Sequence, residues 1–307
     1  MHIALIVNRT ARRFVRQPAL LERLAWAARG RATVHVTSTL EELRAAAARA
    51  VGAGAGLVAL AGGDGSLMAG LTALRRAATD AGRPLPAIAA LPGGTVSTVA
   101  RNFGIAGDPA RWLTRVLALP DHTRPWPSLA VRGDGETRLG FIFGTGLVAR
   151  FFEQYYARGA PGYTGSAAMV ARIFVESFGN GPLARAVLEP LPCRLQVEGR
   201  ALAPDAWSLV CAAVVPNLGI HMLVTYRAAE DATRPHLVAT SRPPRALGPR
   251  MPWVLAGRSL RGEHDGLVTS FALDFPAPDG PYVLDGELLR ARRVEVSAGP
   301  VLRLWMP

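Results

Sequence analysis

Two glycine-rich segments carry the residues best suited to chemistry. The first is Gly62-Gly63-Asp64-Gly65-Ser66, between an apolar run typical of a strand and a run typical of a helix. Glycines at such a turn let backbone N–H groups point at a phosphate, and the positive end of the helix favours the same anion. A negatively charged aspartate is unfavourable where an anion should bind, unless it binds a metal ion or takes up a proton. Asp64 is therefore expected to bind Mg²⁺ or to act as an acid or base. The alternative is a glycine turn in which Asp64 only caps the helix.

A second segment of the same kind, Leu91-Pro92-Gly93-Gly94-Thr95, follows the next predicted strand and also precedes a helix. Because ligands of parallel sheets bind outside the carboxyl ends of the strands, the two loops are expected to face one crevice and to form a joint phosphate cradle. Thr95 offers a hydroxyl to a phosphate or a ribose. Each loop alone is a weak signal, whereas the pair in this order is a strong one.

Short apolar runs alternate with helical runs over the first 120 residues. The expected strands are 3–7, 33–36, 57–60 and 87–90, and the expected helices are 19–28, 40–50, 66–78, 96–103 and 109–119. This alternation predicts an α/β domain with a parallel sheet and helices on both faces.

After Pro120 the pattern changes to short β-like runs separated by glycine and proline, with a helical insert at 147–178. The expected strands are 129–132, 139–143, 185–188, 194–197, 208–215, 237–240, 268–275, 294–297 and 302–305. They predict a mainly antiparallel β-sandwich or barrel. The expected domains are therefore 1–122 and 123–291.

The charged residues exclude several kinds of catalytic site. The 307 residues include 35 basic and 23 acidic side chains, for a net charge of +12, and every basic residue is arginine. Without lysine, a Schiff base, a strand-borne kinase lysine and a lysine P-loop are excluded. The excess of positive charge favours anionic partners, but no nucleic-acid-binding motif accompanies it, so no specific nucleic-acid partner is expected. Phosphate chemistry must then use backbone amides, magnesium and arginine, of which Arg12, Arg13 and Arg101 are nearest in sequence.

Cysteine usage and hydropathy predict a cytoplasmic protein. The two cysteines, Cys193 and Cys211, lack metal-binding spacing and are expected to be core thiols in a reducing compartment. The amino-terminal residues lack the basic region and cleavage site of a signal peptide. The longest apolar stretch, 209–224, contains Pro216, Asn217 and His221, so no membrane span is expected.

The two glycine segments, written as G-G-D-G-S at 62–66 and P-G-G-T-x-x-x-x-A-R at 92–101, resemble the diacylglycerol kinase catalytic domain family. This family includes the bacterial soluble lipid kinases and the sphingosine and ceramide kinases. Asn8-Arg9-Thr10-Ala11-Arg12 matches its phosphate loop, Thr37 matches a threonine near the nucleotide, and Asp285-Gly286-Glu287 matches its D-G-E. The resemblance covers essentially the whole chain. It implies a phosphofructokinase/NAD kinase-like first domain, on which the carboxyl-terminal segment 292–307 packs back.

By this resemblance the protein is an ATP-dependent lipid kinase, which transfers the γ-phosphoryl group to a hydroxyl of a diacylglycerol- or sphingoid-like lipid. Glu287 would be the general base, and Asp285 and Asp64 would hold or orient Mg²⁺. The sphingosine kinase branch would instead make Asp64 the base. The resemblance also implies peripheral binding to a membrane surface, and a homodimer is left open. The implied nucleotide contacts are Asn8, Arg9, Thr10, Ala11, Arg12, Thr37, Gly62, Gly63, Asp64, Gly65, Ser66, Gly94 and Thr95.

Departures from the family keep other functions open. The family's G-T-x-N-D is Gly94-Thr95-Val96-Ser97-Thr98 here, and Val148 stands where many members have aspartate. A turn that holds a structural magnesium in bacterial members corresponds to Asp231-Ala232-Thr233, which lacks the pattern. The alternatives are a small-molecule kinase of the NAD kinase or phosphofructokinase type, and a nucleotide- or lipid-binding protein that has lost turnover. Asp285-Gly286 also has a purely structural interpretation, as a hairpin turn.

Aromatic side chains occur at helical spacing in the insert: Phe151, Phe152, Tyr155 and Tyr156. Such a stripe is more often part of a core, but an acyl chain would need an apolar cleft of this kind.

Overall fold

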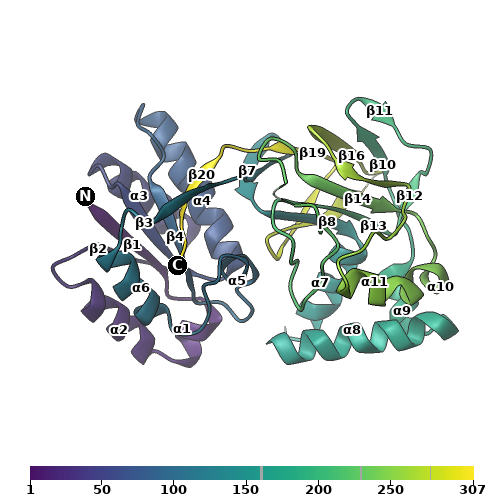
Figure 1. Cartoon of the computed structure of the whole chain (residues 1–307), viewed down its shortest axis with the longest axis horizontal. Coiled ribbons are helices and arrows are strands. Elements are labelled where there is room, and N and C mark those ends of the chain that lie inside the picture. Colours follow the sequence, from purple (N-terminus) through teal and green to yellow (C-terminus); the bar gives the residue numbers. More distant parts are fainter. Residues whose placement is uncertain (160–161, 229, 277) are drawn as a thin grey trace. The chain divides into compact units, whose positions relative to one another are not determined.

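The computed structural model describes residues 1–159, 162–228, 230–276 and 278–307 (Figure 1). The chain divides into two compact units. The first comprises Met1–Trp126 and Val301–Pro307, and the second comprises Pro127–Pro300.

A six-stranded sheet forms the centre of the first unit, in the order β2-β1-β3-β4-β20-β5. Four of its strands are parallel to their neighbours and come from the amino-terminal part: β1 (Ile3–Asn8), β2 (Thr33–Thr37), β3 (Leu57–Gly62) and β4 (Ala87–Pro92). All residues of β3 and β4 are buried, as expected for central strands with helices on both faces. The predicted parallel α/β domain is confirmed.

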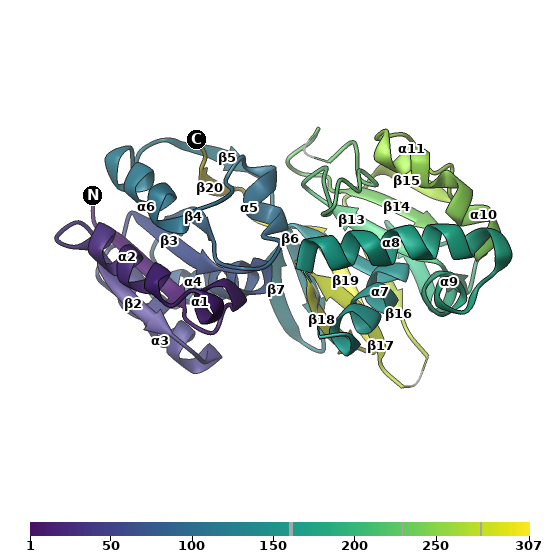
Figure 2. The same ribbon diagram turned by 90° about the horizontal axis from the view of Figure 1, so that it is seen from below.

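Helices cover both faces of this sheet. α3 (Leu40–Gly52) packs against α4 (Asp64–Asp80) on one face, and α2 (Ala19–Ala28) packs against α6 (Pro109–Ala118) on the other (Figures 1 and 2). Two single-turn helices, α1 (Arg12–Arg16) and α5 (Thr98–Asn102), follow β1 and β4. They therefore lie at the strand ends where ligands of such sheets bind.

The end of the chain returns to the first unit. β20 (Leu302–Trp305) lies between β4, to which it is parallel, and β5 (Thr123–Trp126), to which it is antiparallel. The division consequently falls after Trp126 instead of at 122, because β5 pairs with β20. The returning segment begins at Val301 instead of 292, because residues 293–298 form a strand of the second unit.

Two six-stranded antiparallel sheets make up most of the second unit, in the orders β11-β10-β16-β19-β6-β7 and β15-β14-β13-β8-β17-β18. Their strands, with the small β9–β12 pair, are β6 (Leu129–Gly133), β7 (Glu136–Gly140), β8 (Ile142–Gly146), β9 (Leu191–Pro192), β10 (Arg194–Val197), β11 (Arg200–Ala201), β12 (Ala206–Trp207), β13 (Leu209–Ala213), β14 (His236–Thr240), β15 (His264–Leu267), β16 (Ser270–Asp274), β17 (Gly280–Leu284), β18 (Glu287–Ala291) and β19 (Arg293–Ala298). Phe143 of one sheet contacts Phe271 of the other, with ring centroids 5.5 Å apart. The sheets thus pack face to face, as the predicted sandwich requires.

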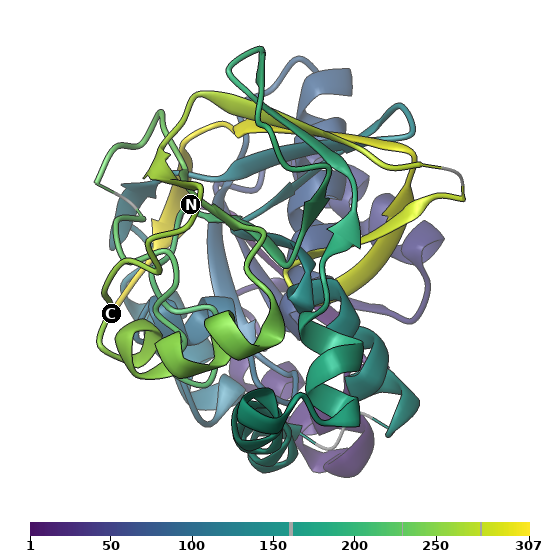
Figure 3. The same ribbon diagram turned by 90° about the vertical axis from the view of Figure 1, so that its right-hand side faces the viewer.

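Helices gather on one side of these sheets (Figure 3). The predicted insert forms α7 (Leu147–Ala157), α8 (Gly162–Gly179) and α9 (Pro182–Leu188), with residues 160 and 161 outside the described residues. The strand predicted at 185–188 is wrong, because these residues end α9. Pro182 opens that helix, and Leu183, Val187 and Leu188 are buried against the insert. Three short helices follow later: α10 (Pro244–Leu247), η1 (Gly248–Arg250) and α11 (Met251–Leu255).

Both cysteines are buried and free, and burial raises the pKa of each thiol to about 12. They pack as core side chains, as expected. Within the described residues, no helix has the length and apolarity that crossing a membrane would need.

Candidate functional site

Asp64 connects the two glycine loops of the first unit. It is the first residue of α4, directly after β3 and the helix cap Gly63. Its carboxylate oxygens accept hydrogen bonds from the backbone N–H groups of Thr98, at 2.8 Å, and Val99, at 3.0 Å. Asp64 therefore caps α5, the helix after the second loop, in addition to its place in the first. Burial raises the pKa of its carboxyl group, and the two backbone donors and Arg101 oppose that shift.

The loops also touch through their backbones. The N–H of Gly93 donates to the carbonyl of Gly62 at 2.7 Å. A Cβ atom on Gly94 would lie 2.6 Å from the Cα of Gly63, closer than real contacts allow. Glycine is thus required for close approach, and the predicted meeting of the two loops is confirmed.

A methyl group at Gly94 is expected to push the loops apart. Gly94→Ala should lower the free energy of unfolding by about 1–3 kcal/mol, the usual cost of overpacking. Urea titration followed by circular dichroism measures this change. Gly52→Ala is the matched control, because a Cβ at that helical position meets nothing within 4 Å. Equal stabilities of the two variants would contradict the close approach.

Asn8 joins the loop after β1 to the same site. Its Nδ2 donates to Ser66 Oγ at 2.8 Å, and its Oδ1 accepts from the N–H and hydroxyl of Thr10. Thr37 is buried, and its hydroxyl donates to the carbonyl of Val7 at 3.2 Å. Its carbonyl accepts from the N–H of Arg9 at 3.0 Å. Asn8 thus links two of the predicted phosphate loops, whereas Thr37 holds β2 to β1 beside them.

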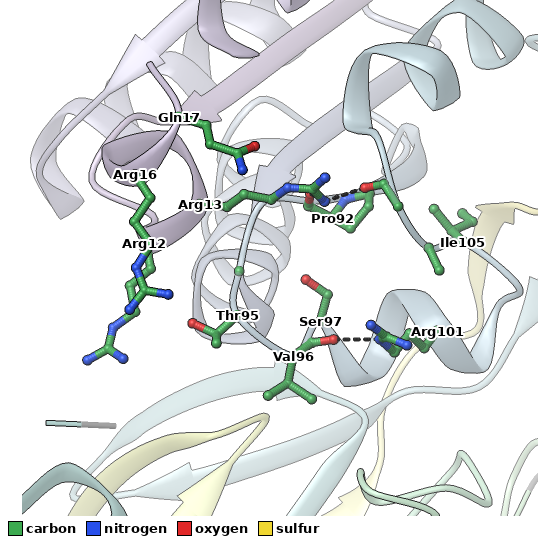
Figure 4. A pocket seen from close by; sticks show the side chains of 13 residues that line it. Arg12, Arg13, Arg16, Gln17, Pro92, Thr95, Val96, Ser97, Arg101 and Ile105 are labelled. Atoms are coloured by element: carbon green, nitrogen blue, oxygen red, sulfur yellow. Dashed lines mark hydrogen bonds between the residues drawn. The ribbon is translucent and has the colours of Figure 1, made fainter. Parts of the chain in front are cut away.

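A pocket of about 240 Å³ lies against the second loop (Figure 4). Gly94 and Thr95 line it, and no acidic side chain of the described residues does. The lining includes four arginines: Arg12, Arg13, Arg16 and Arg101. Sequence reasoning singled out all of these except Arg16, which lies one helical turn after Arg12 on α1 and so could have been found from that spacing. The arrangement suits an anion with several charges.

Two of the arginines are held by backbone carbonyls. Arg13 donates to the carbonyls of Pro92 and Gly107, and Arg101 Nε donates to the carbonyl of Val96 at 2.8 Å. Arg12 and Arg16 are exposed side chains of α1. The pocket therefore combines two arginines that backbone carbonyls hold with two that lie exposed on α1.

Ser97 is the unusual residue of this pocket. Its φ is +51°, in the left-handed region, and its side chain is only 5% exposed. Its hydroxyl has no hydrogen-bond partner among the described residues. A buried hydroxyl without a partner is costly, so one that lines an arginine pocket is suited to a ligand oxygen. The family's asparagine position thus retains a polar group in this chain.

In the second unit, Asp285 and Gly286 form the two-residue turn between β17 and β18. Both have positive φ, +47° and +83°, as the favoured hairpin turn requires. The Asp285 carboxylate is 2% exposed and accepts from the N–H groups of Phe141, at 3.0 Å, and Ile142, at 2.8 Å. Gly140 leaves space for it, since a Cβ there would lie 2.8 Å from Oδ2. The hairpin interpretation is correct for the backbone, and the carboxylate fixes the turn to β8.

Removal of this buried charge is expected to weaken the second unit. Asparagine has the same size as aspartate and tolerates a positive φ. The NH₂ group of its side chain, however, would face a backbone N–H donor. The free energy of unfolding should fall by about 1–3 kcal/mol. Thermal and urea unfolding check this, with the exposed Asp279→Asn as control. An unchanged stability would show that the contacts to Phe141 and Ile142 contribute nothing.

Glu287 begins β18, directly after this turn, and its side chain is exposed. Partial shielding from water raises the pKa of its carboxyl group, and the nearby Arg138 lowers it. A raised pKa brings a carboxylate closer to the range in which it accepts a proton efficiently. The D-G-E segment thus combines a fixed turn with an accessible carboxylate.

The aromatic stripe of α7 borders the same turn. The Tyr156 hydroxyl donates to the carbonyl of Gly286 at 2.6 Å, and Phe152 lies next to Gly286. Phe151 and Phe152 are partly buried against a cluster that includes Tyr155 and Met169. The stripe therefore belongs to the core on one side and reaches the D-G-E turn on the other.

The residues that could hold Mg²⁺ differ in how well they fit it. The described residues contain no group of three or more His, Cys, Asp or Glu side chains that could bind a metal. Mg²⁺ is usually held by one or two carboxylates and substrate phosphates. Asp64 fits better, because it is only partly buried, with hydrogen bonds from the N–H groups of Thr98 and Val99 and from the Thr98 side chain. Asp285 does not fit, because it is buried and its oxygens already face backbone donors. The assignment of site residues to nucleotide and metal stays a prediction.

Comparison with known proteins agrees with the geometry of the first unit. Residues 2–124 match the family model of the diacylglycerol kinase catalytic domain. A solved structure from Bacillus anthracis str. Sterne, assigned as a diacylglycerol kinase, has a TM-score of 0.71 and 15% identity, over 100% of this chain and 95% of that one. Another from the same organism has a TM-score of 0.69 and 16% identity, over 100% and 97%. No curated protein matches the sequence.

The family match and the shared fold confirm the predicted resemblance and the predicted two-domain fold class. Residues 2–124 of the first unit thus match the catalytic domain of a kinase family.

Proposed function

We propose that this chain, which carries a diacylglycerol kinase catalytic domain at residues 2–124, phosphorylates a hydroxyl of a diacylglycerol- or sphingoid-like lipid with ATP. The observation that carries the proposal is the meeting of two glycine loops beside a pocket with four arginines. Phosphoryl transfer depends mainly on positioning and on stabilisation of charge, which such a site supplies without lysine.

The first unit would bind the phosphates. Gly94 and Thr95 line the pocket, so the loop backbone and the Thr95 hydroxyl are available to phosphate oxygens. Arg12 and Arg16 would neutralise their charge, and the Ser97 hydroxyl would gain the partner that it lacks. When bound, Mg²⁺ would withdraw negative charge from the phosphates. Asp64 is the residue proposed to hold it.

The second unit would supply the base. Glu287 is proposed to take the proton from the lipid hydroxyl, for which its exposure and raised pKa are suited. Asp285 then acts as a positioning residue, because its contacts with Phe141 and Ile142 fix the turn that presents Glu287. Phe152 and Tyr156, next to this turn, are proposed to contact the lipid. The substrate class also implies peripheral binding of the protein to a membrane.

Transfer of label tests the proposal. The purified chain is incubated with γ-labelled ATP, magnesium and a total lipid extract, and the phases are separated and chromatographed. We expect label in the organic phase, in a product that requires Glu287. Label on NAD or a soluble sugar would overturn the lipid assignment. Nucleotide binding without transfer to any acceptor would favour a protein that has lost turnover.

A further inference from the structure

A long segment of the second unit is unusually basic. Between Asp231 and Glu263 the sequence has no acidic residue, but it has six arginines: Arg234, Arg242, Arg245, Arg250, Arg258 and Arg261. Most of them lie on or beside the short helices α10, η1 and α11. None of the last five forms an ion pair within the described part of the chain. The segment therefore carries an excess of positive charge.

Two of these arginines lie beside an exposed tryptophan. The guanidinium carbons of Arg250 and Arg261 lie 5.4 and 5.1 Å from the ring centroid of Trp253. Trp253 is 38% exposed and Leu255 is 42% exposed, on the same short helix. Burial lowers the pKa of Arg250, and the like charges of Arg242 and Arg261 lower it further. We call Arg245, Arg250, Trp253, Leu255, Arg258 and Arg261 the arginine–tryptophan face.

Backbone contacts hold this face in place despite the repulsion between its charges. Arg250 donates to the carbonyl of Leu260 at 2.8 Å, and Arg242 donates to the carbonyl of Arg261 at 2.9 Å. Gly248 packs on Ser177 of α8 so closely that no Cβ would fit. Next to Ser177, Phe178 is 56% exposed and Val175 is 69% exposed. The end of α8 that carries these exposed apolar side chains therefore packs against the start of η1.

We infer that the arginine–tryptophan face docks on an anionic lipid bilayer. Tryptophan is the side chain that prefers the membrane interface, and arginines beside it can reach anionic headgroups while leucine and phenylalanine enter the apolar layer. The excess of positive charge provides the complementarity to an acidic lipid surface. Nucleic acid would also attract the arginines, but it offers nothing to Leu255, Val175 and Phe178. The inference rests on the proposed lipid substrate and names the surface that brings the enzyme to it.

Vesicle sedimentation without ATP tests the inference separately from catalysis. The probes are vesicles of phosphatidylcholine alone or mixed with phosphatidylglycerol. We expect Arg245→Gln/Arg258→Gln to weaken binding to the anionic vesicles by about 30-fold, since each arginine near such a surface contributes roughly fivefold. Added salt should remove most of the difference between the wild type and this variant. Trp253→Ala should weaken binding even at high salt.

Matched controls come from the first unit. Arg75→Gln/Arg76→Gln removes the same charge from the exposed side of α4, and Trp26→Ala removes a tryptophan that is 77% exposed. If the controls weaken binding as much as the variants, or if the variants lose binding to a DNA duplex but not to vesicles, the inference is overturned. Phosphorylation of lipid in detergent micelles should be unchanged in Arg245→Gln/Arg258→Gln. No phosphorylation by the wild type would overturn the proposed function and leave the vesicle result standing.

Discussion

Replacement of Glu287 by glutamine is expected to lower kcat for lipid phosphorylation by about 10²–10⁴-fold, the range that a general base contributes. Glutamine keeps the size of the side chain but cannot accept the proton of the lipid hydroxyl. The KM for ATP should stay unchanged, because the proposed phosphate contacts belong to the first unit. Steady-state kinetics with lipid in micelles measure both constants.

The pH profile provides a second check on Glu287. A base acts only when it is deprotonated, so wild-type activity should fall as the pH drops through the pKa of Glu287. Shielding from water raises that pKa above its ordinary value, which moves the acid limb of the profile toward neutral pH. The residual activity of Glu287→Gln should lack this limb.

The matched control for Glu287 is Glu295→Gln, an exposed glutamate of β19 that pairs with Arg293. It should leave kcat and its pH dependence unchanged. If Glu287→Gln keeps the full kcat, Glu287 is not the general base, and Asp64 becomes the candidate for that role.

Removal of two pocket arginines is expected to lower activity by a comparable factor, because it weakens the contacts with the nucleotide. Arg12→Gln/Arg16→Gln should lower kcat/KM for ATP by about 10²–10⁴-fold, because hydrogen bonds to charged groups contribute roughly 1.5–3 kcal/mol each. Both side chains are exposed and line the pocket, so the fold should survive. Calorimetric titration with ATP should show weaker binding of the same order.

Arg75→Gln/Arg76→Gln serves as the charge-matched control for this pair. Its net charge falls equally, but Arg75 and Arg76 do not line the pocket. If ATP binds equally well to both double variants, the pocket is not the phosphate site.

The sequence predicted the central part of the first unit because its signals are local. Short, fully apolar runs such as Leu57–Gly62 and Ala87–Pro92 are typical of buried strands, and glycines directly after them indicate close backbone approach. What could not be predicted depends on contacts between distant residues. Asp64 caps α5 through the N–H groups of Thr98 and Val99, whereas the sequence suggested a metal ligand, an acid or base, or a cap of its own helix.

The second unit was harder to predict for the same physical reason. Residues 185–188 have the apolar composition of a strand, but packing against α7 and α8 makes them helical. The helices α10 and α11 were not predicted because this segment contains prolines at 243, 244, 249 and 252. Proline is nevertheless well tolerated in the first turn of a helix. The left-handed backbone of Ser97 has no sequence signal, because glycine or asparagine is usual there.

A crystal structure with Mg²⁺ and a non-hydrolysable ATP analogue tests the central claim most directly. We predict that the phosphates lie in the pocket beside Gly94 and Thr95, in contact with Arg12, Arg16 and the Ser97 hydroxyl. The metal should lie beside the Asp64 carboxylate. Phosphates bound away from the glycine loops, with the arginine pocket filled only by solvent, would contradict the account.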